Sequence, residues 1–181
     1  EPEMSTMTKF LGPPLKDSFR DFYGFDDEKC EQAVKYYREY YTTKGIFENR
    51  VYDGVEECLK KLSEAGLHLA VATSKPQVFA VKILEHFHLA QYFDYIGGAE
   101  LDGSRSVKAD VIVHTLKNCG VNDRSQVIMA GDRYHDVLGA KALGIDCIGM
   151  LYGYGTREEL SQAGAVYIAE TPLEAAKWLL G

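Results

Sequence analysis

The sequence predicts an α/β fold in which helices cover both faces of a parallel β-sheet, and three observations support this. Short, nearly continuous apolar runs alternate with longer amphipathic stretches from residue 51 onward. Strands of parallel sheets are buried on both faces, so they lack the alternation of half-exposed strands. With 181 residues, 46% of them hydrophobic, the chain can bury the core of one domain and a small appendage.

The first 48 residues are predicted to be helical. Pro13-Pro14 introduces a short helix that ends at Tyr23, and Asp26 or Asp27 caps a longer helix that ends near Lys44. In the longer helix the tyrosines of the stretch YYREYY lie at helical spacing, which favours a packing face over a cofactor site. This segment is expected to differ in structure from the rest of the chain.

From residue 51 onward, predicted helices and strands follow one another in regular order. The predicted strands are the apolar runs 67–73, 93–98, 126–131, 146–151 and 165–169. The predicted helices, most of them ended by a glycine or begun by a proline, are 55–64, 76–87, 107–119, 134–143, 157–162 and 172–180. Ligands bind such sheets beyond the carboxyl ends of the strands, so functional residues are expected after the first three strands.

Polar residues follow the first two strands. Thr73 and Ser74 end the first strand and precede a helix, where hydroxyl and backbone N–H groups can bind an anion or can simply cap the helix. Lys108 lies at the start of a helix, where the helix dipole disfavours a cation. This lysine is therefore either an anion-binding group or an ordinary surface residue.

Two carboxylates follow the third strand. Asp132 comes directly after Gly131, and Asp136 lies one helical turn later. Two acids at this spacing repel one another unless a cation lies between them, and Mg²⁺ accepts carboxylate and water oxygens. The alternative is a strand-end turn in which Asp136 caps the helix. Phosphate, ammonium and divalent-metal groups in one crevice would equip the protein for phosphoryl transfer.

Composition excludes several other classes of protein. The net charge of −7 and the lack of a basic stripe argue against nucleic acid as a partner. The four cysteines are far apart and form no C-x-x-C pair, which is typical of reduced thiols in a cytoplasmic protein and argues against a zinc site. The sequence shows no membrane-span or signal-peptide pattern.

The sequence resembles the haloacid-dehalogenase-superfamily phosphatases, in the branch of the phosphoglycolate phosphatases. Three motifs of that family are matched in order: the second by "VATSK", the third by Lys108 and the fourth by "GDRYHD". The resemblance implies a Rossmann-like three-layer core at 49–181. It also implies an α-helical cap at 1–48, in which "FLGPPLKDSFR" is like the stretch that faces the active site.

The resemblance also implies roles for individual residues. Thr73, Lys108 and Asp132 would be catalytic, with Thr73, the Ser74 N–H and Lys108 holding the phosphate of a small phosphorylated metabolite. Asp132 would bind Mg²⁺, and Asp136 would support its hydrated shell.

Two cations of the first segment are further candidates. Lys16 and Arg20, a turn apart, could bind a substrate carboxylate or second phosphate, or be exposed helix charges.

The protein is expected to be a monomer or weak dimer.

The first motif of the family, D-x-D-x-T at the end of the central strand, is absent from the sequence. In the family its two acids are the nucleophile and the general acid/base. The expectation is that the chain comes from a longer parent enzyme and is inactive alone, since a sheet without its central strand leaves two unpaired edges. The alternatives are a natural loss that leaves a non-catalytic phosphate- or metal-binding remnant, or a parent that is an inorganic pyrophosphatase or a phosphosugar mutase.

Overall fold

The computed structural model describes Phe10 and residues 15–181. The chain divides into two compact units, Glu1–Arg50 and Val51–Gly181. This division lies close to the boundary predicted at residues 48 and 49, while the cap role of the first unit stays a prediction. The predicted helix start at Pro13-Pro14 lies outside the described residues. Within the described part, no helix is long and apolar enough to cross a membrane.

The first unit is helical. It contains α2 (Leu15–Tyr23), α3 (Asp27–Tyr41) and the short 3-10 helix η2 (Gly45–Phe47). Asp26 caps α3, as predicted, because its carboxylate accepts the N–H of Lys29 at 2.9 Å. In α3 the Tyr37 and Tyr41 rings stack with centroids 5.2 Å apart, but Tyr36, Tyr37 and Tyr40 are all exposed. The tyrosine stretch therefore forms one stacked pair of rings and not a buried packing face.

The second unit alternates strands and helices, which confirms the predicted α/β class. Its strands are β1 (Ala70–Pro76), β2 (Tyr95–Ala99), β3 (Ile128–Gly131), β4 (Asp146–Met150) and β5 (Tyr167–Ala169). Its α-helices are α4 (Val55–Glu64), α5 (Gln77–His86), α6 (Lys108–Asn118), α7 (Tyr134–Lys141), α8 (Arg157–Ala163) and α9 (Pro172–Leu180), with short 3-10 turns η3 (Ala90–Tyr92) and η4 (Arg124–Gln126).

The first strand is displaced from its predicted position. It begins at Ala70 rather than at residue 67, and it extends to Pro76, which pairs with Ala99 instead of forming the first turn of a helix. The reason is that the Pro76 backbone is extended, with φ −51° and ψ 130°, so α5 begins one residue later.

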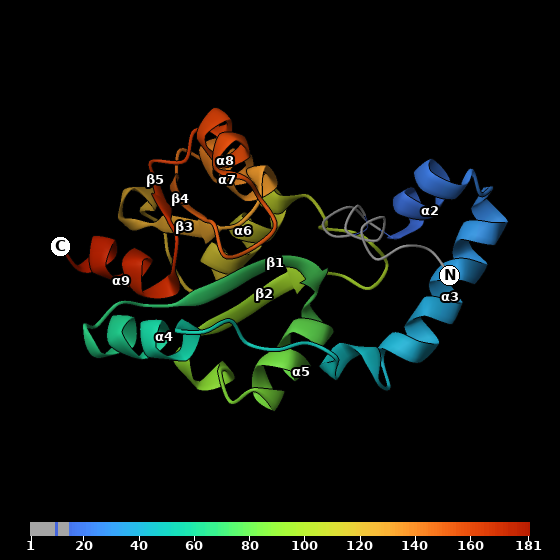
Figure 1. The fold of residues 1–181 in the computed structure, drawn as a ribbon, viewed down its shortest axis with the longest axis horizontal. Coiled ribbons are helices and arrows are strands. Elements are labelled where there is room, and N and C mark those ends of the chain that lie inside the picture. Colours follow the sequence, from blue (N-terminus) through green and yellow to red (C-terminus); the bar gives the residue numbers. More distant parts are fainter. Residues whose placement is uncertain (1–9, 11–14) are drawn as a thin grey trace. The chain divides into compact units, whose positions relative to one another are not determined.

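The strands form two parallel sheets (Figure 1). One has the order β1-β2, with Thr73 opposite Gly98, and the other has the order β3-β4-β5, with Gly131 opposite Gly149. Among the described residues, no strand joins β1 to β3. Within the described part of the chain, β1 and β3 are therefore edge strands of separate sheets, and the absence of a central strand between them stays a prediction.

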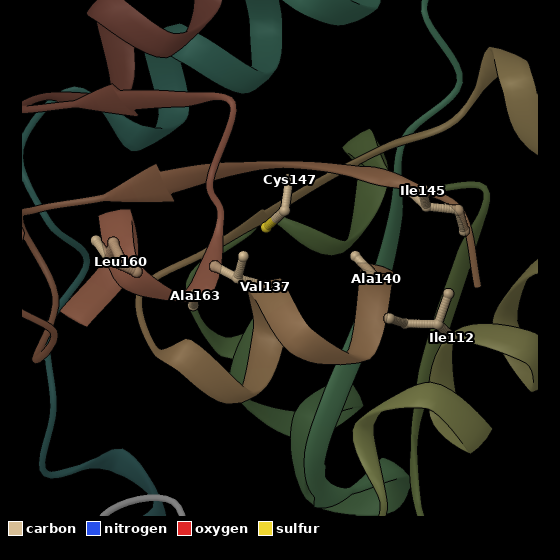
Figure 2. Close-up of a cluster of buried hydrophobic side chains, with 7 residues drawn as sticks. All are labelled: Ile112, Val137, Ala140, Ile145, Cys147, Leu160 and Ala163. Carbon is tan, nitrogen blue, oxygen red and sulfur yellow. The ribbon is translucent and has the colours of Figure 1, made fainter. Parts of the chain in front are cut away.

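Helices cover both faces of the β3-β4-β5 sheet. On one face, Val137 and Ala140 of α7 face Cys147 of β4, together with Leu160 and Ala163 of α8 (Figure 2). On the other face, Ile148 and Met150 of β4 pack against Ala175 of α9, and α4 packs on α9 in turn. Neighbouring residues of β4 thus enter opposite cores, which makes three layers.

All four cysteines are free thiols, and Cys30, Cys58 and Cys147 are buried. Burial raises the pKa of the Cys147 thiol to about 12, and the nearby Asp136 carboxylate adds to this shift. This thiol lies under the candidate site described next and is neutral at ordinary pH.

Candidate functional site

The side chain of Lys108 links strand β1 to helix α7, which follows β3. It is the first residue of α6, and its ammonium donates to the Ala72 carbonyl of β1 at 3.0 Å. The same nitrogen lies 2.8 Å from Oδ1 of Asp136 on α7, and the two side chains are only 12% and 11% exposed. An ammonium group has three N–H donors. Among the described residues, these two contacts use two of the three donors and leave one for a ligand.

Two glycines make this pairing possible. The stem of Lys108 lies against Gly139 of α7, where an added Cβ would be 2.5 Å from Lys108 Cγ. The Asp136 side chain lies against Gly131, where an added Cβ would be 2.3 Å from Asp136 Cβ. A larger residue at either position would push the lysine and the carboxylate apart, since cores tolerate little overpacking.

Asp136 has partners for both carboxylate oxygens. Oδ1 faces Lys108, and Oδ2 accepts the backbone N–H of Arg133 at 3.1 Å, at the start of α7. The cap that the sequence suggested as an alternative is therefore present, together with an ion pair that the sequence did not predict. A role for Asp136 in a magnesium site stays a prediction.

Asp132 is held by a different loop. Its Oδ2 accepts the backbone N–H of Tyr154, in the loop after β4, at 2.9 Å. Asp132 also lines a pocket of about 360 Å³, whose other walls include Tyr52, Met150 and Tyr152. Asp132 and Asp136 are thus close in the chain but bound by different partners, and the described contacts of Lys108 go to Asp136 alone of the two.

Thr73 and Ser74 were predicted to end the first strand, but they lie in the middle of β1, because the strand extends to Pro76. They directly follow Ala72, whose carbonyl Lys108 contacts. Thr73 Oγ1 accepts the N–H of Lys75 at 3.1 Å, so its hydroxyl oxygen stabilises the local turn, and both residues are half-buried. The Ala72 carbonyl, the Lys108 ammonium and the Asp136 carboxylate therefore meet at one place. Of the predicted site residues, the described contacts join Lys108 and Asp136, while the roles of Thr73, Ser74 and Asp132 at a common site stay predictions.

Lys16 and Arg20 lie in the first unit, where carboxylates surround both. Lys16 Nζ is 3.1 Å from Oε1 of Glu31, and Arg20 Nη2 is 2.6 Å from Oδ1 of Asp27. The Arg20 hydrogen bond, with Lys16 nearby, lowers the pKa of Asp27. These cations are exposed and already balanced by acids of their own unit, so their role toward a substrate stays a prediction.

The donor set for a metal is incomplete in the described part of the chain. No three His, Cys, Asp or Glu side chains there gather closely enough to hold an ion. One oxygen of Asp132 accepts the Tyr154 N–H, and the other is a candidate ligand. This fits Mg²⁺, which commonly uses one or two protein carboxylates, with waters and substrate phosphate supplying the remaining ligands.

Glu159 of α8 was not predicted from the sequence. Its Oε1 accepts Nε–H of Arg133 and the backbone N–H of Tyr134, both at 2.9 Å. These donors directly follow Asp132. The only signal in the sequence is the glycine-rich run YGYG at 152–155, since glycines often mark close approaches of two backbones.

A family model and a solved structure both show to which proteins this chain is similar. The model of the family described as "Haloacid dehalogenase-like hydrolase" matches residues 1–150. A solved structure, that of a predicted phosphatase from Clostridium acetobutylicum, superposes with a TM-score of 0.92 at 48% identity. That superposition covers 99% of this chain and 83% of the other.

Curated relatives differ in the activities for which they are named. A 5′-nucleotidase from Pseudomonas aeruginosa is 45% identical over 160 residues, which is 88% of this chain and 72% of that protein. A tyrosine-protein kinase, PtkA of Mycobacterium tuberculosis, is 38% identical over 92% of this chain, and a phosphoglycolate phosphatase from Pseudomonas savastanoi is 31% identical over 83%. The chain spans little more than half of these last two proteins, 56% and 54%.

Proposed function

The chain belongs to the haloacid dehalogenase-like hydrolase family, and we propose that it forms the phosphate- and metal-binding part of a magnesium-dependent phosphatase that hydrolyses a small phosphomonoester. The observation that carries this proposal is the position of Lys108. Its nearly buried ammonium lies between β1 and α7, and within the described part of the chain its two contacts leave one N–H donor for an anion.

In this proposal the residues of β1 and α6 bind the phosphoryl group. Thr73 donates its hydroxyl, and Ser74 its backbone N–H, to phosphate oxygens. Lys108 stabilises the negative charge of the transferring group from a position that Asp136 and the Ala72 carbonyl fix. Asp136 thus acts by orienting the lysine, because its own carboxylate is already bound.

Asp132 supplies a carboxylate oxygen for the metal. Bound Mg²⁺ would offset the like charges of the phosphate and of an attacking carboxylate. The attacking group is an aspartate of the D-x-D-x-T motif, which this sequence does not contain. Its attack breaks the bond from phosphorus to the alcohol oxygen, the second acid of the motif protonates that oxygen, and water then hydrolyses the aspartyl-phosphate.

The substrate class follows from the relatives rather than from the site. Two of the three curated relatives named above are phosphatases of small phosphomonoesters, a nucleotidase and a phosphoglycolate phosphatase. The helical first unit is proposed as the cap that excludes water during the first step. Lys16 and Arg20 of that unit would contact the part of the substrate remote from the phosphate once they exchange their carboxylate partners.

The test compares the chain alone with the same chain joined to an upstream strand that carries D-x-D-x-T. Release of phosphate from p-nitrophenyl phosphate is measured with and without Mg²⁺. The extended chain should gain magnesium-dependent activity, and Asp132→Asn should abolish it. Asp146→Asn, which removes an exposed acid from β4, is the matched control and should stay active. If Asp132→Asn keeps the activity of the control, the metal assignment is wrong, and if neither chain is active, the phosphatase proposal is wrong.

A further inference from the structure

The loops that follow β3 and β4 bind each other around Asp132. Asp132 and Arg133 form the first loop, which leads into α7, and residues 151–156 form the second, which leads into α8. Tyr154 of the second loop donates its N–H to Oδ2 of Asp132. In return, Glu159 in the first turn of α8 accepts from Arg133 of the first loop and from Tyr134, the first residue of α7. Three hydrogen bonds, all at 2.9 Å, therefore join residues 132–134 to the second loop and the start of α8.

Glu159 is itself well fixed. It lies in the first turn of α8, where its N–H donates to Oγ1 of the capping Thr156 at 3.1 Å. The next residue, Leu160, is fully buried in the core that Figure 2 shows. A carboxylate on such a rigid support can orient a neighbouring loop, because few of its own torsions remain free.

The Glu159 carboxylate is held in its charged form. Its side chain is only 25% exposed, and burial alone would raise its pKa. The Tyr134 N–H and the Arg133 guanidinium outweigh burial and lower the pKa. The bonds to the Asp132 loop are therefore charge-assisted, which makes them stronger than neutral ones.

Asp132 has little room for another conformation. A Cβ added to Gly153 would lie 2.3 Å from Asp132 Cβ, and one added to Gly155 would lie 2.1 Å from the Asp132 carbonyl oxygen. The backbone of the second loop thus lies directly against Asp132. The side-chain direction of Asp132 depends on how the two loops are joined.

From this geometry we propose that Glu159 is a positioning residue, which fixes the loop that carries Asp132 and so sets the direction of the Asp132 carboxylate toward a divalent cation. The inference rests on the proposed function, since it takes Asp132 as a metal ligand. Removing a residue that orients a metal ligand without touching the metal commonly lowers the metal affinity by about 10- to 100-fold. Glu159 never contacts the ion in this arrangement and acts through Arg133 and Tyr134.

The first readout needs no metal. In Glu159→Ala, hydrogen exchange at the Tyr154 amide should become at least about tenfold faster, although that amide bonds to Asp132 and not to Glu159. Glu158→Ala is the matched control, because Glu158 is the exposed neighbour in the same turn. Glu159→Gln, which keeps the shape and loses the charge, should lie between the two and serves as the variant to test if Glu159→Ala does not fold. Exchange at Tyr154 equal to that in Glu158→Ala would overturn the inference.

The second readout is the dissociation constant for Mn²⁺, measured by paramagnetic broadening of amide signals. Glu159→Ala should weaken binding about tenfold or more, and Glu158→Ala should not change it. Asp132→Asn separates the two proposals. If it binds Mn²⁺ as the wild type does, the proposed metal site fails and the inference fails with it. If Asp132→Asn weakens binding while Glu159→Ala does not, only the positioning role is refuted.

Discussion

Replacing Lys108 by methionine should destabilise the protein strongly, because it leaves a nearly buried carboxylate without its cation. At 2.8 Å the gross attraction between Lys108 and Asp136 is about 6 kcal/mol for an effective dielectric constant near 20. Desolvation of both groups offsets much of this. Removing one partner of such a pair typically costs about 3–5 kcal/mol. We expect about 3 kcal/mol, since Asp136 keeps the Arg133 N–H.

The assay is a double-mutant cycle of urea unfolding near neutral pH. Lys108→Met and Asp136→Asn should each lower the free energy of unfolding by about 3 kcal/mol, since each leaves a desolvated charge alone. The double variant should lose less than the sum, with a coupling energy of about 2 kcal/mol or more. Lys117→Met, which removes an exposed lysine from the same helix, should change stability by less than about 0.5 kcal/mol.

Additivity would refute this reasoning. If the double variant loses the sum of the two single losses within about 0.5 kcal/mol, Lys108 and Asp136 do not interact as a desolvated pair. Circular dichroism of each folded variant checks that the comparison is between intact structures.

Three further outcomes are expected. Gly153→Ala puts a Cβ 2.2 Å from Oδ2 of Asp132, so it should lower the free energy of unfolding by about 1–3 kcal/mol and weaken Mn²⁺ binding. An unchanged melting temperature and an unchanged Mn²⁺ dissociation constant would contradict the close approach of Gly153 to Asp132. Because burial raises the pKa of Cys147 to about 12, iodoacetamide near pH 8 should label the more exposed Cys119 before Cys147. Peptide mass spectrometry measures the labelling of each cysteine, and equal rates for the two would contradict the burial of Cys147. Because the pKa of Glu159 is lower in the folded protein, the ionised carboxylate stabilises the fold at pH values above its ordinary pKa of 4.5. This stabilisation is lost as the pH falls through the lowered pKa. The stability difference between wild type and Glu159→Gln should therefore close in acid, and urea titrations that keep it constant down to about pH 3 would contradict the assignment.

Local patterns in the sequence predict the ends of the helices more accurately than the ends of the strands. The helices α4 and α9 begin and end at their predicted residues, because periodicity, prolines and glycines act within a few residues of each helix end. The start of β1 was misplaced by three residues, from 67 to Ala70. Strand ends depend on pairing with a distant segment, here β2, and no local pattern records that pairing.

The candidate site shows the same limit. Sequence order predicts that Thr73, Lys108 and Asp132 follow successive strands and face one edge of the sheet, because parallel topology brings strand ends together. Thr73 lies instead in the middle of β1, because pairing with β2 extends that strand to Pro76. Sequence order did not predict that Lys108 would pair with Asp136, since a choice between two acids four residues apart depends on side-chain direction. Glu159 was missed because its partners, Arg133 and Tyr134, lie 26 and 25 residues away in the chain, and no local pattern records such a distant contact.

The packing of α9 between α4 and the sheet has a consequence for the order of folding. Helix α9 separates α4 from strand β4, and its buried Ala175 and Ala176 touch the two layers. Because α9 follows both elements in the chain, this core cannot close until α9 has been synthesised, and the apolar faces of α4 and β4 stay exposed until then. Chaperones that bind apolar surface can therefore act on this unit up to the step in which α9 packs.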